Sequence, residues 1–233
     1  MNKPYIICHM VMSIDGKVTG DFLKRNNHLE SSEYYYQINR EYQADAYMCG
    51  RVTMEESFTN KYYPNLNDYP IIDNYDDYIY SLDTTLYAVS LDPHGRLGWK
   101  TNRVIDVDHD PGYDNAGIIE VLTHQVDKRY LGYLQSKNIS YIFVGENKVD
   151  LNILLDKLYK YFNIKKILLE GGSIINGSFM EENLIDELSL VIDPVIGGNN
   201  DKPLFSKTQI VEYELKEIKK YNHIIWLNYI KRS

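Results

Sequence analysis

Apolar positions recur along the chain in two alternating patterns, which predict an alternation of strands and helices. Short apolar runs bounded by Gly, Pro, Asn or Asp are typical of buried strands. Strands are predicted at 4–12, 45–49, 85–90, 103–107, 118–122, 140–145, 166–170, 186–195, 209–219 and 222–231. Apolar residues three or four positions apart predict helices at 30–42, 51–58, 127–138, 150–161 and 173–181.

The order of these elements predicts the fold class. Strands separated by helices favour a mostly parallel central sheet with helices on both faces, and the final two strands favour an antiparallel edge. No repeat and no Gly/Ser- or Pro-rich linker divides the chain, so we expect residues 1–233 to form a single α/β domain. Residues 59–85 are rich in Tyr, Asn, Asp and Pro and have no period. They predict a long loop that either covers a ligand site or is a surface excursion.

Composition and charge disfavour several classes of protein. A formal net charge of −8 without a basic run disfavours nucleic-acid binding, and no apolar run approaches the length of a membrane span. The two cysteines, Cys8 and Cys49, each lie in an apolar strand-like run. We therefore expect no disulfide framework, and we expect a cytoplasmic protein. A small anionic ligand is compatible with this composition.

The strongest candidate site is the predicted strand-to-helix turn at Glu170, Gly171, Gly172 and Ser173. Paired glycines let the backbone approach a ligand, and a new helix directs N–H groups at it. Such a turn can hold a diphosphate without a cation. The same residues are also compatible with a tight turn that binds nothing.

Two further turns follow predicted strands. In the first, Gly50 ends a strand and Arg51 and Thr53 begin a helix. The arginine can form a forked pair with the 2′-phosphate of NADP, and the threonine can reach a phosphate oxygen. The second is Ser13-Ile14-Asp15-Gly16-Lys17, directly after the first strand, where α/β sheets bind ligands. A solvated arginine with a capping threonine, and a plain Asp-Gly turn, are the alternatives.

In order and spacing the three motifs resemble the dihydrofolate-reductase-like superfamily, and especially the C-terminal reductase domain of bifunctional riboflavin-biosynthesis proteins. The family's S-x-D-G-K loop matches Ser13 to Lys17, and its D-A-x-x-x-G-R-x-T-x-E segment matches Asp45 to Glu55. Its E-G-G-x-x-x-N-G-x-[FL] loop matches Glu170 to Phe179, and L-I-D-E-L-x-L and P-V-I-x-G follow at 184–190 and 194–198. The resemblance covers essentially the whole chain.

The resemblance implies NADPH as cofactor and assigns roles by position. The residues implied to bind the cofactor are Ser13, Gly50, Arg51, Thr53, Ser90, Leu91, Gly171, Gly172, Ser173 and Ile174. Ser90 and Leu91 are those implied to hold the adenosine half. Asp15 and Lys17, beside the nicotinamide and substrate, and Glu170, at the pocket floor, are the implied catalytic residues. No metal site is predicted, because the six histidines lack metal-ligand spacing.

The implied activity is the reduction of a ribosylaminopyrimidine phosphate such as 5-amino-6-(5-phosphoribosylamino)uracil. Hydride would pass directly from NADPH to C1′ of the ring-opened ribosyl imine, giving a ribityl chain. The resemblance also implies a homodimer, with strands 209–231 as candidate interface.

The chain departs from this family in two places. Residues 56–66 lack the D-D-P-x-L-T-x-R stretch that meets the substrate phosphate, and no zinc deaminase motif is present. Lys61, Lys24 and Arg25 are the cations available to replace the missing arginine.

Two other functions stay open. One is a dihydrofolate reductase, which needs a buried carboxylate on the first helix, with Glu30 and Glu33 as candidates. The other is a nucleotide-binding protein without catalysis.

Overall fold

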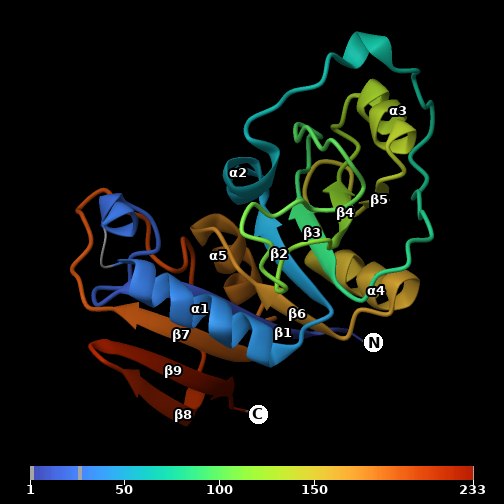
Figure 1. Cartoon of the computed structure of the whole chain (residues 1–233). Helices are drawn as coiled ribbons and strands as arrows, with labels where there is room; N and C mark the ends of the chain where they lie inside the picture. The colour runs from blue at the N-terminus through green and yellow to red at the C-terminus, as the bar shows by residue number, and fades with distance from the viewer. Residues whose placement is uncertain (1–2, 26–27, 233) are drawn as a thin grey trace. The chain divides into compact units, whose positions relative to one another are not determined.

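The computed structural model describes residues 3–25 and 28–232. Two compact units interleave along the chain (Figure 1). Unit 1 comprises residues 1–4 and 45–165, and unit 2 comprises residues 5–44 and 166–233. No helix among the described residues is both long enough and apolar enough to cross a membrane.

Unit 2 contains five strands in the order β6-β1-β7-β9-β8. The strands are β1 (Tyr5–Ser13), β6 (Lys166–Leu169), β7 (Glu187–Asp193), β8 (Tyr213–Tyr221) and β9 (Ile224–Lys231). Its helices are η1 (Asp21–Lys24), α1 (His28–Tyr42) and α5 (Ser173–Glu181). Strand β1 is parallel to β6 and β7, whereas β9 is antiparallel to β7 and β8.

Helix α1 lies across the face of β1 and β7 (Figure 1). Ile38 of α1 is 1 % exposed and packs with Val191, Ile224 and Trp226 in an apolar cluster. Because alternate residues of a strand point to opposite faces, Ile225, Leu227 and Tyr229 lie on the sheet face away from α1.

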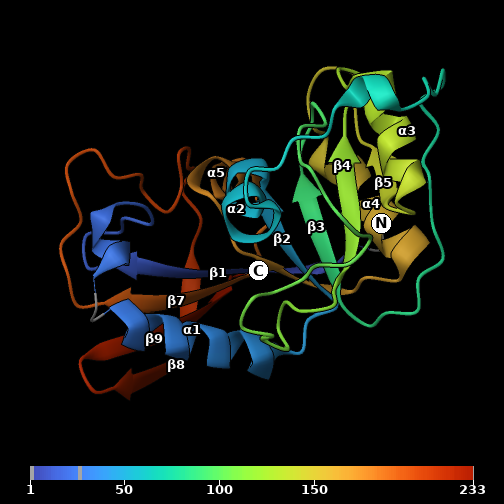
Figure 2. The same ribbon diagram turned by 45° about the horizontal axis from the view of Figure 1, so that its top comes forward.

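Unit 1 contains four parallel strands in the order β5-β4-β3-β2, and Figure 2 shows β2, β3 and β4 side by side. The strands are β2 (Ala46–Gly50), β3 (Tyr87–Leu91), β4 (Gly117–Leu122) and β5 (Ser140–Phe143). The helical elements are α2 (Arg51–Met54), a π-turn η2 (Glu55–Thr59), η3 (Leu66–Asp68), α3 (Lys128–Ser136) and α4 (Leu151–Phe162).

Local sequence explains why α4 forms where it does. The Asp150 side chain caps its first turn by accepting hydrogen bonds from the N–H groups of Asn152 and Ile153. Asn163 ends the helix in the left-handed conformation, with φ 54°. The leucines at 3.6-residue spacing between these ends are buried, as the sequence predicts.

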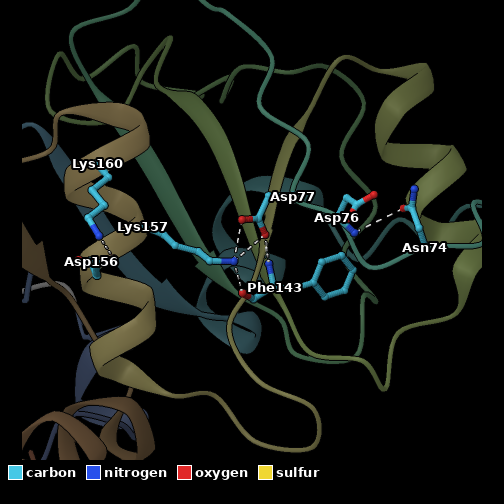
Figure 3. Close-up of polar contacts among 7 residues, drawn as sticks. All are labelled: Asn74, Asp76, Asp77, Phe143, Asp156, Lys157 and Lys160. Carbon is cyan, nitrogen blue, oxygen red and sulfur yellow. Dashed lines mark hydrogen bonds and ion pairs between the residues drawn. The ribbon is translucent and has the colours of Figure 1, made fainter.

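The loop predicted at 59–85 is fixed to unit 1 over much of its length (Figure 3). Asp77 Oδ1 accepts hydrogen bonds from Phe143 N at 2.8 Å and from Lys157 Nζ at 2.9 Å. Tyr78 and Tyr141 exchange two backbone hydrogen bonds, so the segment covers the edge of β5. Residues 72–80, hereafter the strap, also bond α3 through Ile72 N and Lys128 O. This half of the loop is therefore a fixed surface element.

The strand predicted at 103–107 is wrong. Of these residues only Arg103 forms a bridge, and Ile105 and Val107 are exposed. Asp106 Oδ2 accepts a hydrogen bond from Asp110 N, and Asp114 Oδ1 accepts one from Asp106 N, each at 2.9 Å. These side-chain-to-backbone bonds hold the segment in turns and compete with strand pairing.

The other predicted elements are confirmed, with ends displaced by a few residues at most places. Parallel strands in both units and the antiparallel β8 and β9 confirm the predicted α/β fold class. The helix predicted at 51–58 continues past Met54 as a π-turn. That residues 1–233 form one domain stays a prediction.

Candidate functional site

The loop after β1 is closed by its own side chains. Ser13 Oγ is fully buried, donates to Asp15 Oδ1 at 2.6 Å and accepts from Lys17 N at 2.9 Å. Asp15 Oδ1 also accepts from Gly197 N at 2.7 Å. The hydrogen bonds from Gly197 and Ser13 hold the pKa of Asp15 below its usual range. Asp15 is therefore ionised at neutral pH and ties this loop to residues 194–198.

The turn between β6 and α5 is shaped by its glycines. Gly171 has φ 92°, which disfavours any side chain, and its peptide bond to Gly172 is cis. A Cβ atom at Gly172 would meet no protein atom within 4 Å. No side chain caps α5, because Gly172 occupies the capping position. This turn therefore offers open space in front of helix N–H groups that no side chain satisfies.

An unsatisfied hydroxyl lies at the same turn. Ser173 is 3 % exposed and its Oγ has no hydrogen-bond partner among the described residues. Buried hydroxyls are normally paired, so this one fits a site that a ligand completes. Ile174 is exposed in the same turn. Open space and an unpaired hydroxyl at a helix start together fit the diphosphate predicted for this turn.

Glu170, at the end of β6, is buried and held by α1. Its Oε1 accepts a hydrogen bond from Asn39 Nδ2 at 2.7 Å. The two carboxylates considered for a pterin site lie elsewhere: Glu30 and Glu33 are both exposed. Glu33 is 4.0 Å from Arg40. Helix α1 therefore places the side-chain amide of Asn39 against the Glu170 carboxylate. The same helix leaves Glu30 and Glu33 exposed.

The turn between β2 and α2 is built around Arg51. Gly50 ends β2 with an extended backbone, and Arg51 begins α2. Arg51 Nη1 lies 2.9 Å from Glu55 Oε2, with 29 % of the arginine side chain exposed. Thr53 is half-buried in the same short helix. A partly exposed arginine next to a strand end is compatible with the phosphate contact predicted for it, which stays a prediction.

The end of β3 is more buried than its predicted role suggests. Ser90 is fully buried and Leu91 is 6 % exposed. Ser90 pairs in register with Glu120 of β4, which is fully buried and accepts a hydrogen bond from Trp99 Nε1. Burial, with the Asp92 charge nearby, raises the pKa of Glu120 well above its ordinary value. Ser90 is thus fully buried beside a carboxyl group whose ionisation burial disfavours.

Known proteins resemble this chain over its whole length. The RibD C-terminal domain family matches residues 4–226. The chain belongs to this family.

The similarity of the RibD C-terminal domain to individual proteins is broad but distant. The 2,5-diamino-6-ribosylamino-4(3H)-pyrimidinone 5′-phosphate reductase of Aquifex aeolicus is 27 % identical over 207 residues, covering 87 % of this chain and 82 % of that protein. The pyrimidine reductase-like protein of Corynebacterium diphtheriae superposes with a TM-score of 0.69 at 18 % identity, covering 100 % and 93 %. Acinetobacter baumannii RibD gives 0.65 at 19 %, covering 100 % of this chain. The chain spans 59 % of that RibD's length.

The cations considered as replacements in this RibD-family chain differ in their surroundings. Lys24 Nζ pairs with Asp21 Oδ1 at 2.8 Å, and both side chains are largely exposed. Arg25 Nη2 lies 3.1 Å from Asp193 Oδ2, and that aspartate is buried at the end of β7. Lys61 is exposed, with φ 55°. Arg25 is thus the one that a buried carboxylate orients.

Two buried polar residues near the predicted site residues, Asn39 in unit 2 and Glu120 in unit 1, were not predicted from the sequence. Asn39 lies on an ordinary helix face, 131 residues from its partner Glu170, and carries no local signal. Glu120 did carry one, since it interrupts the apolar run Gly-Ile-Ile-Glu-Val-Leu of β4. A charged residue at a buried strand position needs a partner, which here is Trp99.

Proposed function

We propose that this protein is the NADPH-dependent reductase of 2,5-diamino-6-ribosylamino-4(3H)-pyrimidinone 5′-phosphate or a closely similar ribosylaminopyrimidine phosphate. The observation that carries the proposal is the match to the Aquifex aeolicus reductase of that name, which extends over 87 % of this chain and 82 % of that enzyme. The oxidoreductase class expected from the sequence agrees with this relative.

Support for a dinucleotide cofactor comes from the two strand-to-helix turns. The open space at Gly172 and the unpaired Ser173 Oγ fit a diphosphate. Arg51 fits a 2′-phosphate, which NADPH carries and NADH lacks. We assign the diphosphate to Gly171, Gly172, Ser173 and Ile174, and the 2′-phosphate to Arg51 with Thr53. Ser13, Gly50, Ser90 and Leu91 stay cofactor-binding predictions.

When bound, the cofactor supplies a hydride for C1′ of the ring-opened ribosyl imine, and the imine nitrogen takes up a proton. The chain's own groups orient the substrate and exclude water. Asp15, ionised and bonded to Ser13 and Gly197, positions the loop after β1. Asp15, Lys17 and Glu170 stay our candidates for catalytic residues, with Asn39 fixing Glu170.

The test is NADPH oxidation with a panel of substrates. It contains the 2,5-diamino-pyrimidinone, 5-amino-6-(5-phosphoribosylamino)uracil, their dephosphorylated forms, and dihydrofolate. We expect turnover of the phosphorylated ribosyl compounds and a product two hydrogens heavier by mass spectrometry. Turnover of dihydrofolate alone would contradict the proposal and favour the pterin alternative. Cofactor binding without turnover of any compound would favour a non-catalytic nucleotide-binding protein.

The substrate phosphate needs a cation, because a buried dianion without one is costly. We propose that Arg25, with Lys24, or Lys61 supplies it. One variant replaces Lys61, and a second replaces Lys24 and Arg25 together. Each should raise KM for the phosphorylated substrate and leave NADPH affinity unchanged. Equal turnover of the dephosphorylated substrate would remove the need for any of the three.

We also propose a homodimer that forms through β8 and β9. Leu215, Ile218 and Ile225 lie exposed on this hairpin, at 50 %, 58 % and 39 %. Leu215 and Ile218 pair with Tyr229 and Leu227, which point away from α1, so the apolar side chains share one face. The same face of a second copy would cover it. Light scattering of the wild type should give a dimer mass at micromolar concentration and that of Ile218→Lys a monomer, and a monomeric wild type would refute this.

The buried cysteines and the net charge bear on the cellular location and on the class of ligand. Cys8 and Cys49 are buried and neither forms a disulfide within the described residues, which supports the proposed cytoplasmic location. The net charge of −8 supports a small molecule rather than nucleic acid as the ligand.

A further inference from the structure

Arg51 has an acidic partner, Glu55, and Glu55 in turn contacts Tyr63, a residue outside the sequence motifs. Glu55 follows Arg51 by one helical turn, and its Oε2 accepts a hydrogen bond from Arg51 Nη1 at 2.9 Å. Only 10 % of the Glu55 side chain is exposed. Within residues 3–25 and 28–232 the guanidinium makes no other hydrogen bond, so four of its five N–H donors are not engaged by protein.

The other oxygen of the same carboxylate is also engaged. Tyr63 Oη donates a hydrogen bond to Glu55 Oε1 at 2.6 Å. Asn60 and Lys61, with φ 51° and 55°, turn the chain back so that Tyr63 reaches the carboxylate. Glu55 is therefore held from both sides, by Arg51 within its own helix and by Tyr63 from the following segment.

Charge supports this arrangement. The hydrogen bond from Tyr63, followed by the contact with Arg51, holds the pKa of Glu55 below its usual range. The carboxylate is thus ionised whenever the protein is near neutral pH. A charged acceptor with two fixed donors restricts the arginine side chain, which otherwise has many rotamers.

Tyr63 lies in residues 56–66, the segment that departs from the riboflavin-reductase pattern. In this chain the segment lacks the family's arginine. It instead contributes Tyr63, which bonds to Glu55 beside Arg51. The departure therefore brings Tyr63 into contact with Glu55, the partner of Arg51.

We propose that Glu55 and Tyr63 are positioning residues that hold the Arg51 guanidinium for the 2′-phosphate and thereby set the preference for NADPH over NADH. The proposal rests on the cofactor assignment above. Glu55 occupies one N–H group of Arg51, and the remaining edge of the fork stays directed toward a phosphate. Loss of either positioning residue frees the arginine to adopt other rotamers, which weakens phosphate binding without touching the rest of the cofactor.

The test measures binding of adenosine 2′,5′-bisphosphate and 5′-AMP by calorimetry, so that it does not depend on turnover. For Glu55→Ala we expect about tenfold weaker binding of the bisphosphate, and for Tyr63→Phe about threefold. Binding of 5′-AMP should stay within about twofold in both variants. NADPH and NADH should show the same split.

Glu56→Ala is the matched control. Glu56 is an exposed neighbour on the same turn, so its removal deletes an equal charge without touching Arg51. We expect bisphosphate binding to change by less than about twofold. Thermal unfolding checks that each variant is folded, and Tyr63→Phe keeps the test usable if Glu55→Ala unfolds, because Tyr63 is largely exposed.

The possible outcomes distinguish a failure of the positioning role from a failure of the cofactor assignment. Unchanged or tighter bisphosphate binding by Tyr63→Phe and Glu55→Ala would overturn the positioning role, and tighter binding would show that Glu55 competes with the phosphate. If Arg51→Ala leaves bisphosphate binding unchanged, or the wild type binds no dinucleotide, the cofactor assignment itself fails.

Discussion

Two strand-to-helix turns of this protein, to which we assign the phosphates of the proposed cofactor, differ in the groups that they offer. After β6, Gly171 and Gly172 remove side chains, and the backbone of α5 with the unpaired Ser173 hydroxyl remains. After β2, the proposed anion partner is a side chain, Arg51, which is already paired with the carboxylate of Glu55. One turn offers space and dipoles, and the other offers a charge whose position other residues control.

This difference assigns different consequences to the two turns. A diphosphate is common to NADPH and NADH, so the glycine turn should affect the binding of both equally. A 2′-phosphate distinguishes them, so the arginine turn should affect the ratio of their affinities. Substitutions in the two turns should therefore differ in how they change the affinities for NADPH and NADH.

The largest effect is expected at Gly172. Gly172→Val should abolish measurable binding of NADPH and NADH, a loss of more than about 100-fold, because its side chain would fill the space left for the diphosphate. Gly172→Ala separates an effect on the ligand from an effect on the fold, since its Cβ would meet no protein atom within 4 Å. Calorimetry gives the affinities and thermal unfolding the stability, with Ser178→Ala on α5 as control. A folded Gly172→Val protein with wild-type affinity would make this turn structural only.

Next in size is Arg51. Arg51→Ala removes a charge-assisted phosphate pair worth about 1.5–3 kcal/mol, so Kd for NADPH should rise about 10- to 150-fold. Kd for NADH should barely change, because it has no 2′-phosphate. Parallel titrations with the two cofactors measure the split. Equal losses for both would remove the distinction between the two turns.

Ser173→Ala is expected to weaken both cofactors about two- to tenfold, as for one neutral hydrogen bond. The stability of the cofactor-free protein should not fall, because the replaced Oγ is buried without a partner. Denaturant unfolding and cofactor titration together test this pair of results. A clear loss of stability with unaltered affinity would mean that the hydroxyl serves the fold.

The smallest effect is that of salt. Raising ionic strength from about 50 to about 500 mM should reduce the NADPH-to-NADH affinity ratio about two- to threefold, since Arg51 is partly exposed and its charge is screened. NADH binding, which depends on backbone groups, should change less. Titrations of Arg51→Ala at both salt concentrations provide the control, and a wild-type ratio that does not respond would argue against an ionic contact at this turn.

Local patterns predicted most of the strands and helices and the positions of the motifs, because these depend on residues close in sequence. Helix α5 has the predicted ends, since a glycine pair precedes it. What was not predictable depends on partners distant in the chain or on choices among hydrogen bonds. Asn39 reaches Glu170 across 131 positions, and the aspartates at 106–114 replaced a strand by turns. The motif contained Glu55, but its Tyr63 contact depends on two left-handed residues that no apolar pattern marks.

The strap at residues 72–80 bears on how the protein behaves in concentrated solution. A free sheet edge is a template on which another chain can add a strand, and such growth leads to aggregation. Tyr78 occupies the backbone groups of Tyr141 on β5, and Lys157 and Asp77 fasten that cover (Figure 3). The salt bridge between Asp77 and Lys157 thus fastens the segment that covers the β5 edge, and its loss should make that edge more accessible to the strands of neighbouring molecules.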